Sequence, residues 1–218
     1  MRIQIILKRG KNMNHIEKAI ERYPALKVTK DEIEKAVELI VAAHAKGGKL
    51  LLCGNGGSYA DCEHIAGELL KGFVMKREPK GKDLKWLSEA MGSDAELLQR
   101  GLCAIPLPSI SGALTAYIND VDPTLSYAQL VYSMGKAGDV LIAISTSGNS
   151  QNVVKAAKCA KALGISVIGL TGESGGELLD LADACIRVPA LETYKVQELH
   201  LPVYHAICLE VEERLFLN

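Results

Sequence analysis

Two short apolar runs, each followed by a loop of small residues and then by a helical pattern, constrain the fold of this chain most strongly. The first is LLLC in KLLLCGNGGS, residues 49–58, and the second is VLIAI in DVLIAISTSGNS, residues 139–150. Strands that are apolar on both faces and alternate with helices are typical of a parallel sheet covered on both sides. In such a sheet both loops lie at carboxyl ends of strands, where ligands bind in open α/β folds.

The rest of the chain repeats this alternation. Strands are also predicted at 102–107, 165–172 and 185–190, and helices at 13–26, 30–49, 59–76, 108–138 (with a turn), 149–164, 176–183 and 192–216. Thr29 and Glu32 have the spacing of a capping box, Pro202 predicts a bend or a break in the last helix, and residues 77–101 predict a loop with a short helix. The sequence therefore predicts an α/β fold with three layers, a parallel sheet flanked by helices, and an N-terminal helical extension.

Composition excludes several classes of protein. The net charge is −1, from 25 basic and 26 acidic residues, and 5% of residues are aromatic, so nothing indicates a nucleic-acid surface. The first ten residues have too short an apolar stretch for a secretory signal, and no run reaches the roughly 18 apolar residues of a membrane span. Six cysteines occur without a CxxC pair. We expect a cytoplasmic protein with reduced thiols, most of them in the core, and no membrane contact.

The loop STSGNS, residues 145–150, places several hydroxyl groups before a predicted helix. One interpretation is a turn with a helix cap. The other is a site for an anion, because a helix N-terminus offers free N–H groups and partial positive charge, and hydroxyl groups donate further hydrogen bonds. Neither this loop nor GNGGS is a GxGxxG or GxxxxGK[ST] motif, so a dinucleotide or a nucleoside triphosphate is not indicated. The second glycine-rich loop on the same sheet edge favours the anion site.

Two pairs of polar side chains share helix faces. His64 and Glu68 are four residues apart, and Gln197 and His205 are eight apart. A histidine and a carboxylate at this spacing can ligate a metal or act as a base with its partner, although a surface ion pair is the more common use. His205 lies in an apolar run and could instead be a core histidine. Surface ion pairs are also what we expect for His44 and His200.

The motifs CGNGGS followed by His and Glu, then ISTSGNS, then Gln and His, resemble the SIS (sugar isomerase) domain family. The resemblance covers residues 30–218. Within this family the sequence looks most like the phosphoheptose isomerases, which convert sedoheptulose 7-phosphate to D-glycero-D-manno-heptose 7-phosphate. The resemblance implies a flavodoxin-like sheet, a homotetramer with active sites between subunits, and a bound zinc ion. The two N-terminal helices fall outside the pattern of alternating strands and helices, so we divide the chain into an N-terminal helical segment at 1–46 and an SIS domain at 47–218. The first ten residues have no counterpart in the family, which makes Met13 an alternative start.

The resemblance also implies roles for individual residues. The zinc ligands would be His64, Glu68, Gln197 and His205, with Glu68 and His205 as the catalytic proton-transfer residues. The substrate-binding residues would be Asn55, Gly56, Gly57, Ser58, Asn119, Asp120, Ser145, Thr146, Ser147, Ser150 and Gln197. An aldose–ketose isomerase needs a base at carbon and an acid–base group at oxygen, and we assign these to Glu68 and His205 respectively.

The sequence departs from the family near the substrate. Gly72 stands where an arginine is expected, so Lys71 or Lys76 would replace it as a point charge. Tyr194 lies at a position that can touch the sugar, and the segment from 74 to 101 is longer than expected. These changes leave other substrates open, such as another anionic sugar. A non-catalytic SIS protein that binds the replication initiator, or a sugar-phosphate sensor, is the further alternative, but the complete His, Glu, Gln and His set favours the enzyme.

Overall fold

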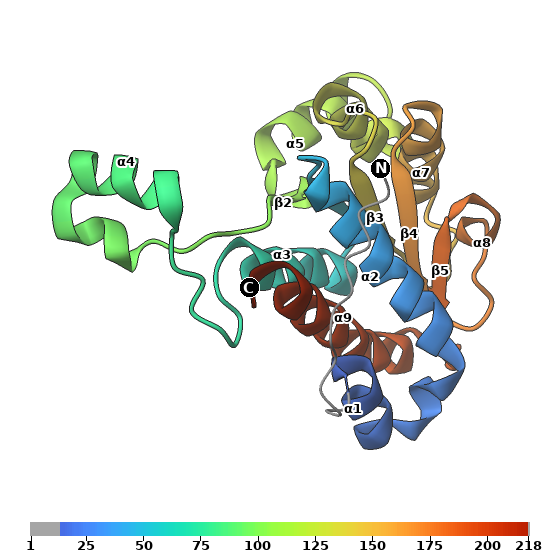
Figure 1. Cartoon of the computed structure of the whole chain (residues 1–218). Coiled ribbons are helices and arrows are strands. Elements are labelled where there is room, and N and C mark those ends of the chain that lie inside the picture. The colour runs from blue at the N-terminus through green and yellow to red at the C-terminus, as the bar shows by residue number, and fades with distance from the viewer. Residues whose placement is uncertain (1–13, 218) are drawn as a thin grey trace, which may run out of the picture.

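A five-stranded parallel sheet forms the centre of the computed structural model, which describes residues 14–217 (Figure 1). The strands are β1 (Leu50–Cys53), β2 (Ala104–Pro106), β3 (Val140–Ile144), β4 (Ser166–Thr171) and β5 (Ala184–Arg187). They lie in the order β2-β1-β3-β4-β5, and all neighbouring pairs are parallel. This is the 2-1-3-4-5 order of flavodoxin-like sheets, so the predicted fold class is confirmed. The alternative start at Met13 lies outside the described residues.

Helices connect the strands close to the predicted positions. Their bounds are α1 (His15–Arg22), α2 (Lys30–Ala45), α3 (Gly57–Leu70), α4 (Gly81–Met91), α5 (Ser111–Asp120), α6 (Ser126–Met134), α7 (Gln151–Ala162), α8 (Leu178–Leu181) and α9 (Thr193–Phe216). Short 3-10 turns are η1 (Pro24–Thr29), η2 (Gly92–Leu97), η3 (Leu107–Ser109) and η4 (Pro123–Leu125). The helix predicted for 59–76 ends earlier, because Lys71 is already extended. Helix α9 continues through Pro202 without a break.

Two apolar layers cover the sheet, because successive strand residues point to opposite faces. In β1, Leu50 and Leu52 pack into one layer with side chains from α1, α2, α3 and α9. Leu51 and Cys53 pack into the other layer with side chains from α6, α7 and α8. The uninterrupted apolar pattern of the strands follows from this burial on both faces. The first layer matters most for function, since it holds α3 against α9.

The segment 74–101, which we call the arm, extends away from the sheet and its helices (Figure 1). It carries α4 and η2, which pack against each other. All of α4 lies within the described part of the chain, and none of its residues is buried. The side chain of Trp86 on α4 is 61% exposed. The predicted loop with a short helix is therefore confirmed, and the arm buries only Arg77, Pro79 and Ala95.

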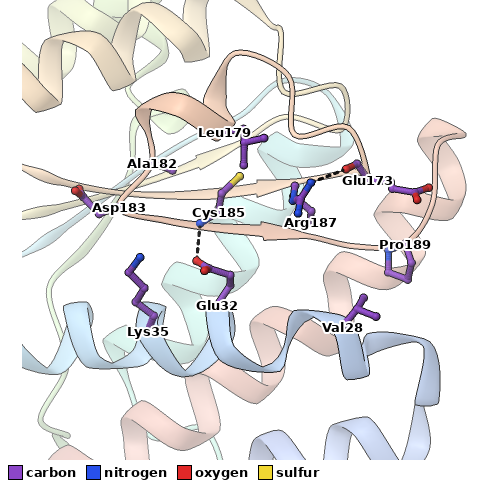
Figure 2. A pocket seen from close by; sticks show the side chains of 10 residues that line it. All are labelled: Val28, Glu32, Lys35, Glu173, Leu179, Ala182, Asp183, Cys185, Arg187 and Pro189. Carbon is purple, nitrogen blue, oxygen red and sulfur yellow. Dashed lines mark hydrogen bonds between the residues drawn. The ribbon is translucent and has the colours of Figure 1, made fainter.

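The predicted capping box at Thr29 and Glu32 is wrong. The hydroxyl of Thr29 donates to the carbonyl oxygen of Leu26 instead, at 2.7 Å, and makes no capping bond. Glu32 reaches from α2 to the open edge of β5, where its carboxylate accepts the backbone N–H of Cys185 at 3.0 Å (Figure 2). An edge strand has unpaired backbone groups, so tertiary contact here outweighs the local capping preference. A complete capping box forms at Asn14 and Glu17, at the start of α1.

The cysteines follow the expectation of mainly buried thiols. All six are free, and four of them, Cys53, Cys62, Cys185 and Cys208, are buried. Burial raises the pKa of the Cys53 and Cys208 thiols, which keeps both protonated and unreactive at neutral pH. Across residues 14–217, no helix offers an apolar stretch that would reach through a lipid bilayer.

His200 is a core residue, so its prediction as a surface ion pair is wrong. Its side chain is fully buried, and its Nε2 lies 3.3 Å from the carbonyl oxygen of Thr171. Its Nδ1 has no hydrogen-bond partner among the described residues. Burial lowers the pKa of His200 from 6.5 to about 4, so the imidazole is neutral in the folded protein. The helical spacing alone could not distinguish a buried face of α9 from a solvated one.

We predict that His200 makes folding stability depend on pH. Its folded pKa of about 4 lies below the unfolded value of 6.5. The stabilisation is therefore complete above pH 6.5 and is lost as the pH falls towards 4, by up to about 3 kcal/mol. Urea unfolding between these limits should show a flatter profile for His200→Gln than for the wild type. Parallel profiles would contradict this assignment.

Candidate active site

Residues 54–58, the turn after β1 and the first residues of α3, are shaped by close backbone approach, and we call this segment the glycine loop. Gly56 has a positive φ of 55°, which disfavours any other residue. A side chain at Gly57 would collide with the side-chain amide of Gln197 from α9. Asn55 and Gly57 are exposed, whereas Ser58 is buried. The glycine loop thus presents bare backbone next to Gln197.

The loop between β3 and α7, residues 145–150, which we call the hydroxyl loop, is held in place from both sides. Ser145 is buried and its hydroxyl donates to the Ser150 hydroxyl at 3.0 Å. Gly148 has a φ of 70° and packs so tightly on Gly175 that a side chain would collide with its carbonyl oxygen. Ser147 is exposed, and its hydroxyl accepts the N–H of Asn149 at 3.2 Å. The loop is rigid but keeps hydroxyl groups at the surface.

The capping interpretation of the hydroxyl loop finds little support. Ser150 is the N-cap residue of α7, yet its side chain makes no capping hydrogen bond within the described chain. Its hydroxyl is used inside the loop instead. The side-chain acceptor in the first turn of α7 is Asn152, which accepts the N–H of Val153 at 3.0 Å. The hydroxyl loop therefore does not supply the cap, which favours an anion site for its hydroxyl groups.

Two amides join the loops to each other. Asn55 in the glycine loop and Asn152 on α7 exchange a pair of hydrogen bonds, each 2.9 Å long. The parallel pairing of β1 with β3 brings these residues side by side, because both follow the carboxyl ends of adjacent strands. The two loops thus form one surface at the point where the winding of the sheet reverses.

His64, Glu68 and His205, which we call the donor cluster, converge from α3 and α9. The Nε2 atoms of His64 and His205 are 3.3 Å apart, and the Nε2 of His64 is 3.3 Å from a Glu68 oxygen. One donor atom from each residue lies within 4.8 Å of the others. Burial, followed by the nearby His64, lowers the pKa of His205, which favours its neutral imidazole. A simple surface ion pair would not include this second histidine.

Tyr204 and Asp61 support the donor cluster, and the sequence analysis did not identify them. The hydroxyl of Tyr204 lies 3.0 Å from Nδ1 of His64. Burial raises the pKa of Asp61, and a hydrogen bond from Tyr204 lowers it only in part. When the Tyr204 hydroxyl donates its hydrogen bond to Asp61, the Tyr204 oxygen accepts the Nδ1–H of His64. That tautomer leaves the lone pair of Nε2 directed into the cluster, as in metal-binding histidines.

The donor cluster fits a divalent cation such as zinc. Two imidazole nitrogens and one carboxylate oxygen are the donor types of catalytic zinc sites, which keep one further position open. Tyr204 supplies the outer hydrogen bond that such a histidine needs. The two facing Nε2 atoms also need either a shared cation or a proton between them, since two lone pairs repel each other.

Other predicted residues lie further out on the surface. Asn119 and Asp120 are exposed at the end of α5 and bond to each other, Nδ2 to Oδ1, at 2.8 Å. Tyr194 is 60% exposed at the start of α9. Within the described residues, none of the hydrogen bonds of these three side chains reaches the donor cluster, so their roles stay predictions.

The sequence profile of the SIS domain family matches residues 13–101 and 104–172. This chain belongs to the SIS domain family. The phosphoheptose isomerase of Rhodospirillum rubrum is 38% identical to it over 183 residues, 84% of this chain and 86% of the relative. The phosphoheptose isomerase of Aneurinibacillus thermoaerophilus is 35% identical over 209 residues, 94% of each. The structure of a phosphoheptose isomerase from Neisseria gonorrhoeae covers 91% of this chain and 95% of its own, with 33% identity and a TM-score of 0.72.

This SIS domain has no room for an arginine at position 72. A side chain at Gly72 would collide with the carbonyl oxygen of Met75 and with Gln99. Of the two lysines considered as replacements, Lys76 pairs with Glu78 at 2.9 Å. Lys71 lies 3.6 Å from a Glu68 oxygen, at the edge of the donor cluster. Lys71 is therefore the better candidate for a cationic contact with substrate.

We predict that Tyr204→Phe weakens zinc binding by about 10- to 100-fold, because outer-shell hydrogen bonds orient ligating histidines. Tyr127→Phe is a matched control, since the Tyr127 hydroxyl donates to the carbonyl oxygen of Gly54 at 2.7 Å, outside the donor cluster. Competition with a chromogenic chelator measures both affinities. Equal zinc affinities in the two variants would show that Tyr204 does not orient His64.

Proposed function

We propose that this SIS domain protein is an aldose–ketose isomerase of a phosphorylated sugar. The convergence of Glu68 and His205 from two helices carries the proposal, because isomerisation needs two proton-transfer groups at one place. A second support is the hydroxyl loop at the carboxyl edge of the sheet, which places hydroxyl groups before the N-terminus of α7 for the phosphate.

The reaction divides between the two groups. Glu68 takes the proton from C1 of the ketose and returns it to C2, so the carbon-bound hydrogens balance. His205 gives a proton to the C2 oxygen and takes one from the C1 oxygen, which yields the aldose through an enediol. The neutral imidazole of His205 is suited to this exchange, since it can both accept and donate.

Zinc is part of the proposal. His64, Glu68 and His205 would hold it. Gln197, the fourth predicted ligand, would have to turn away from Gly57 to join them. When bound, zinc would stabilise the negative charge that develops on the oxygens in the enediolate. Glu68 then has two uses, and its second oxygen, which lies nearer to Lys71, would be free for the proton transfer.

The phosphate would bind at the hydroxyl loop, through Ser145, Thr146, Ser147 and Ser150. Asn55, Gly56, Gly57 and Ser58 would contact the sugar, with Gln197 behind them. We extend the same role to Asn119 and Asp120, which are exposed and would approach substrate from α5. In a folded rigid loop these donors need little reorganisation, which favours binding.

Sedoheptulose 7-phosphate is the substrate we propose, and D-glycero-D-manno-heptose 7-phosphate the product. The names of the relatives at 35–38% identity support it. A different anionic sugar is the second candidate, favoured by one observation: the space at position 72 excludes the expected arginine, and Lys71 offers only a point charge. A protein without catalysis is disfavoured, because the whole donor cluster is present.

We also propose a homotetramer with active sites between subunits, in the cytoplasm. Large apolar side chains that stay exposed in the single chain support the assembly, such as Tyr132 on α6, at 68%, and Trp86 on the arm. Free thiols support a reducing compartment. A solution mass other than that of four chains would remove the tetramer from the proposal.

The test of this function is turnover of sedoheptulose 7-phosphate with zinc and with a chelator, together with the variant Glu68→Gln. We expect zinc-dependent turnover in the wild type. The variant should lose about 10²- to 10⁴-fold in kcat, the range for a general base, while still binding the sugar phosphate. Glu63→Gln, an exposed glutamate on the same helix, is the matched control. Retained turnover in Glu68→Gln would remove Glu68 from the chemistry.

The hydroxyl loop gives a separate prediction. Ser147→Ala should raise KM for a phosphorylated ketose by about tenfold, since hydrogen bonds to charged groups contribute roughly 1.5–3 kcal/mol. The melting temperature should stay close to that of the wild type, because Ser147 is exposed. Ser133→Ala on α6 serves as the control for loss of an exposed serine. A fall in melting temperature with no change in KM would return the loop to a capping role.

A further inference from the structure

Arg77, at the base of the arm, is among the most deeply buried side chains of the protein. It is 1% exposed, although the rest of the arm lies largely in solvent. Its Nε is 2.7 Å from Oε1 of Glu212 on α9, and both side chains are inaccessible to solvent. Burying two charges costs several kcal/mol each unless further hydrogen bonds satisfy them. Such a pair therefore needs an explanation beyond anchoring an exposed loop.

Both carboxylate oxygens of Glu212 accept hydrogen bonds. Oε1 also accepts the backbone N–H of Phe73 at 2.8 Å, and Oε2 accepts that of Val74 at 3.0 Å. Glu212 thus fixes the chain where it leaves α3 and enters the arm. The ring of Phe73 lies 5.6 Å from that of His205, centroid to centroid. The anchored segment therefore touches the donor cluster directly.

The rest of the Arg77 guanidinium binds the end of α3. Nη1 donates to the carbonyl oxygen of Leu69 at 2.7 Å, and Nη2 donates to the carbonyl oxygen of Glu68 at 3.1 Å. The last carbonyl groups of a helix have no partner within the helix, and a cation there is favourable. Arg77 thus caps α3 at the residue that carries the proposed base.

Glu212 and His205 are seven residues apart on α9, so they lie on nearly the same face. One buried ion pair therefore connects three elements: the last turn of α3 with Glu68, the helix that carries His205, and the arm. The tight turn at Gly72 and a hydrogen bond from the N–H of Arg100 to the carbonyl oxygen of Arg77, 2.6 Å long, bring Arg77 back to this position.

We propose that Arg77, together with Glu212, is a positioning residue that sets the distance between Glu68 and His205. This inference rests on the proposed isomerase function for its kinetic part only. This role would account for a buried ion pair at the base of the arm, where an apolar contact would anchor the chain without the cost of burying two charges. Arg77 touches neither substrate nor the reacting atoms.

The test uses Arg77→Lys and Glu212→Gln. Lysine keeps the charge but lacks the fork that reaches both carbonyl groups, and glutamine keeps the shape but loses the charge. We expect kcat to fall by about 10- to 100-fold with KM little changed, the penalty for misplacing catalytic groups by about 1 Å. Zinc affinity, measured by chelator competition, should fall by about 10- to 100-fold as the donor cluster loosens.

Asp139→Asn is the matched control. Asp139 is fully buried and accepts the N–H groups of Lys49 and Lys136, at 3.0 and 2.9 Å, and the Lys49 ammonium at 2.6 Å. It precedes β3, at the opposite end of the strand from the hydroxyl loop. This variant should lower the melting temperature but leave kcat and zinc affinity unchanged.

The two readouts keep the inference separate from the proposed function. If the wild type does not turn over sedoheptulose 7-phosphate, zinc affinity alone still reports the positioning of the donor cluster. Folded Arg77→Lys and Glu212→Gln proteins, verified by circular dichroism, with wild-type kcat and zinc affinity would overturn the inference. So would losses that merely equal those of Asp139→Asn. A loss of zinc affinity in both variants, absent in the control, would support it.

Discussion

The parallel pairing of β1 with β3 is the contact on which the site depends. It places two loops that are almost 90 residues apart in sequence next to each other, and their side chains lock through Asn55 and Asn152. Strands β4 and β5 continue the sheet beyond β3, and β2 continues it beyond β1, so the chain winds in opposite directions from this point. A crevice at such a reversal is where α/β sheets bind ligands.

The proposed proton-transfer groups are not on these loops. Glu68 and His205 lie on α3 and α9, which pack in one apolar layer over the sheet. Helices hold side chains more firmly than loops do, and the buried faces of both helices fix their separation. The two proposed roles therefore fall on different parts of the fold: the anion would bind to loop backbone and hydroxyl groups, and the reacting centre would lie on two packed helices.

Much of this arrangement could be predicted from sequence, because it rests on local patterns. Apolar runs gave the strands, and the spacings of His64 with Glu68 and of Gln197 with His205 gave shared helix faces. Long-range contacts could not be read in this way. Glu32 has the spacing of a cap but bonds to Cys185, and His200 has the spacing of a surface histidine but is buried. The sequence also showed no sign of Tyr204, Asp61 and Arg77. Their contacts depend on burial or on partners more than 130 residues away, and neither leaves a periodic pattern in the sequence.

The contact of Glu32 with β5 also bears on how copies of this protein can meet. An open strand edge is a template for adding a strand from another molecule, which leads to uncontrolled sheet growth. Here the carboxylate occupies the outward N–H of Cys185, and charged Lys35, Asp183 and Arg187 border the cavity of about 530 Å³ beside the strand (Figure 2). A neighbouring backbone would have to displace a charge-assisted hydrogen bond and dehydrate these groups. The sheet edge is thereby disfavoured for self-association, so the proposed tetramer would form through helical surfaces, where assembly can stop at a defined number of chains.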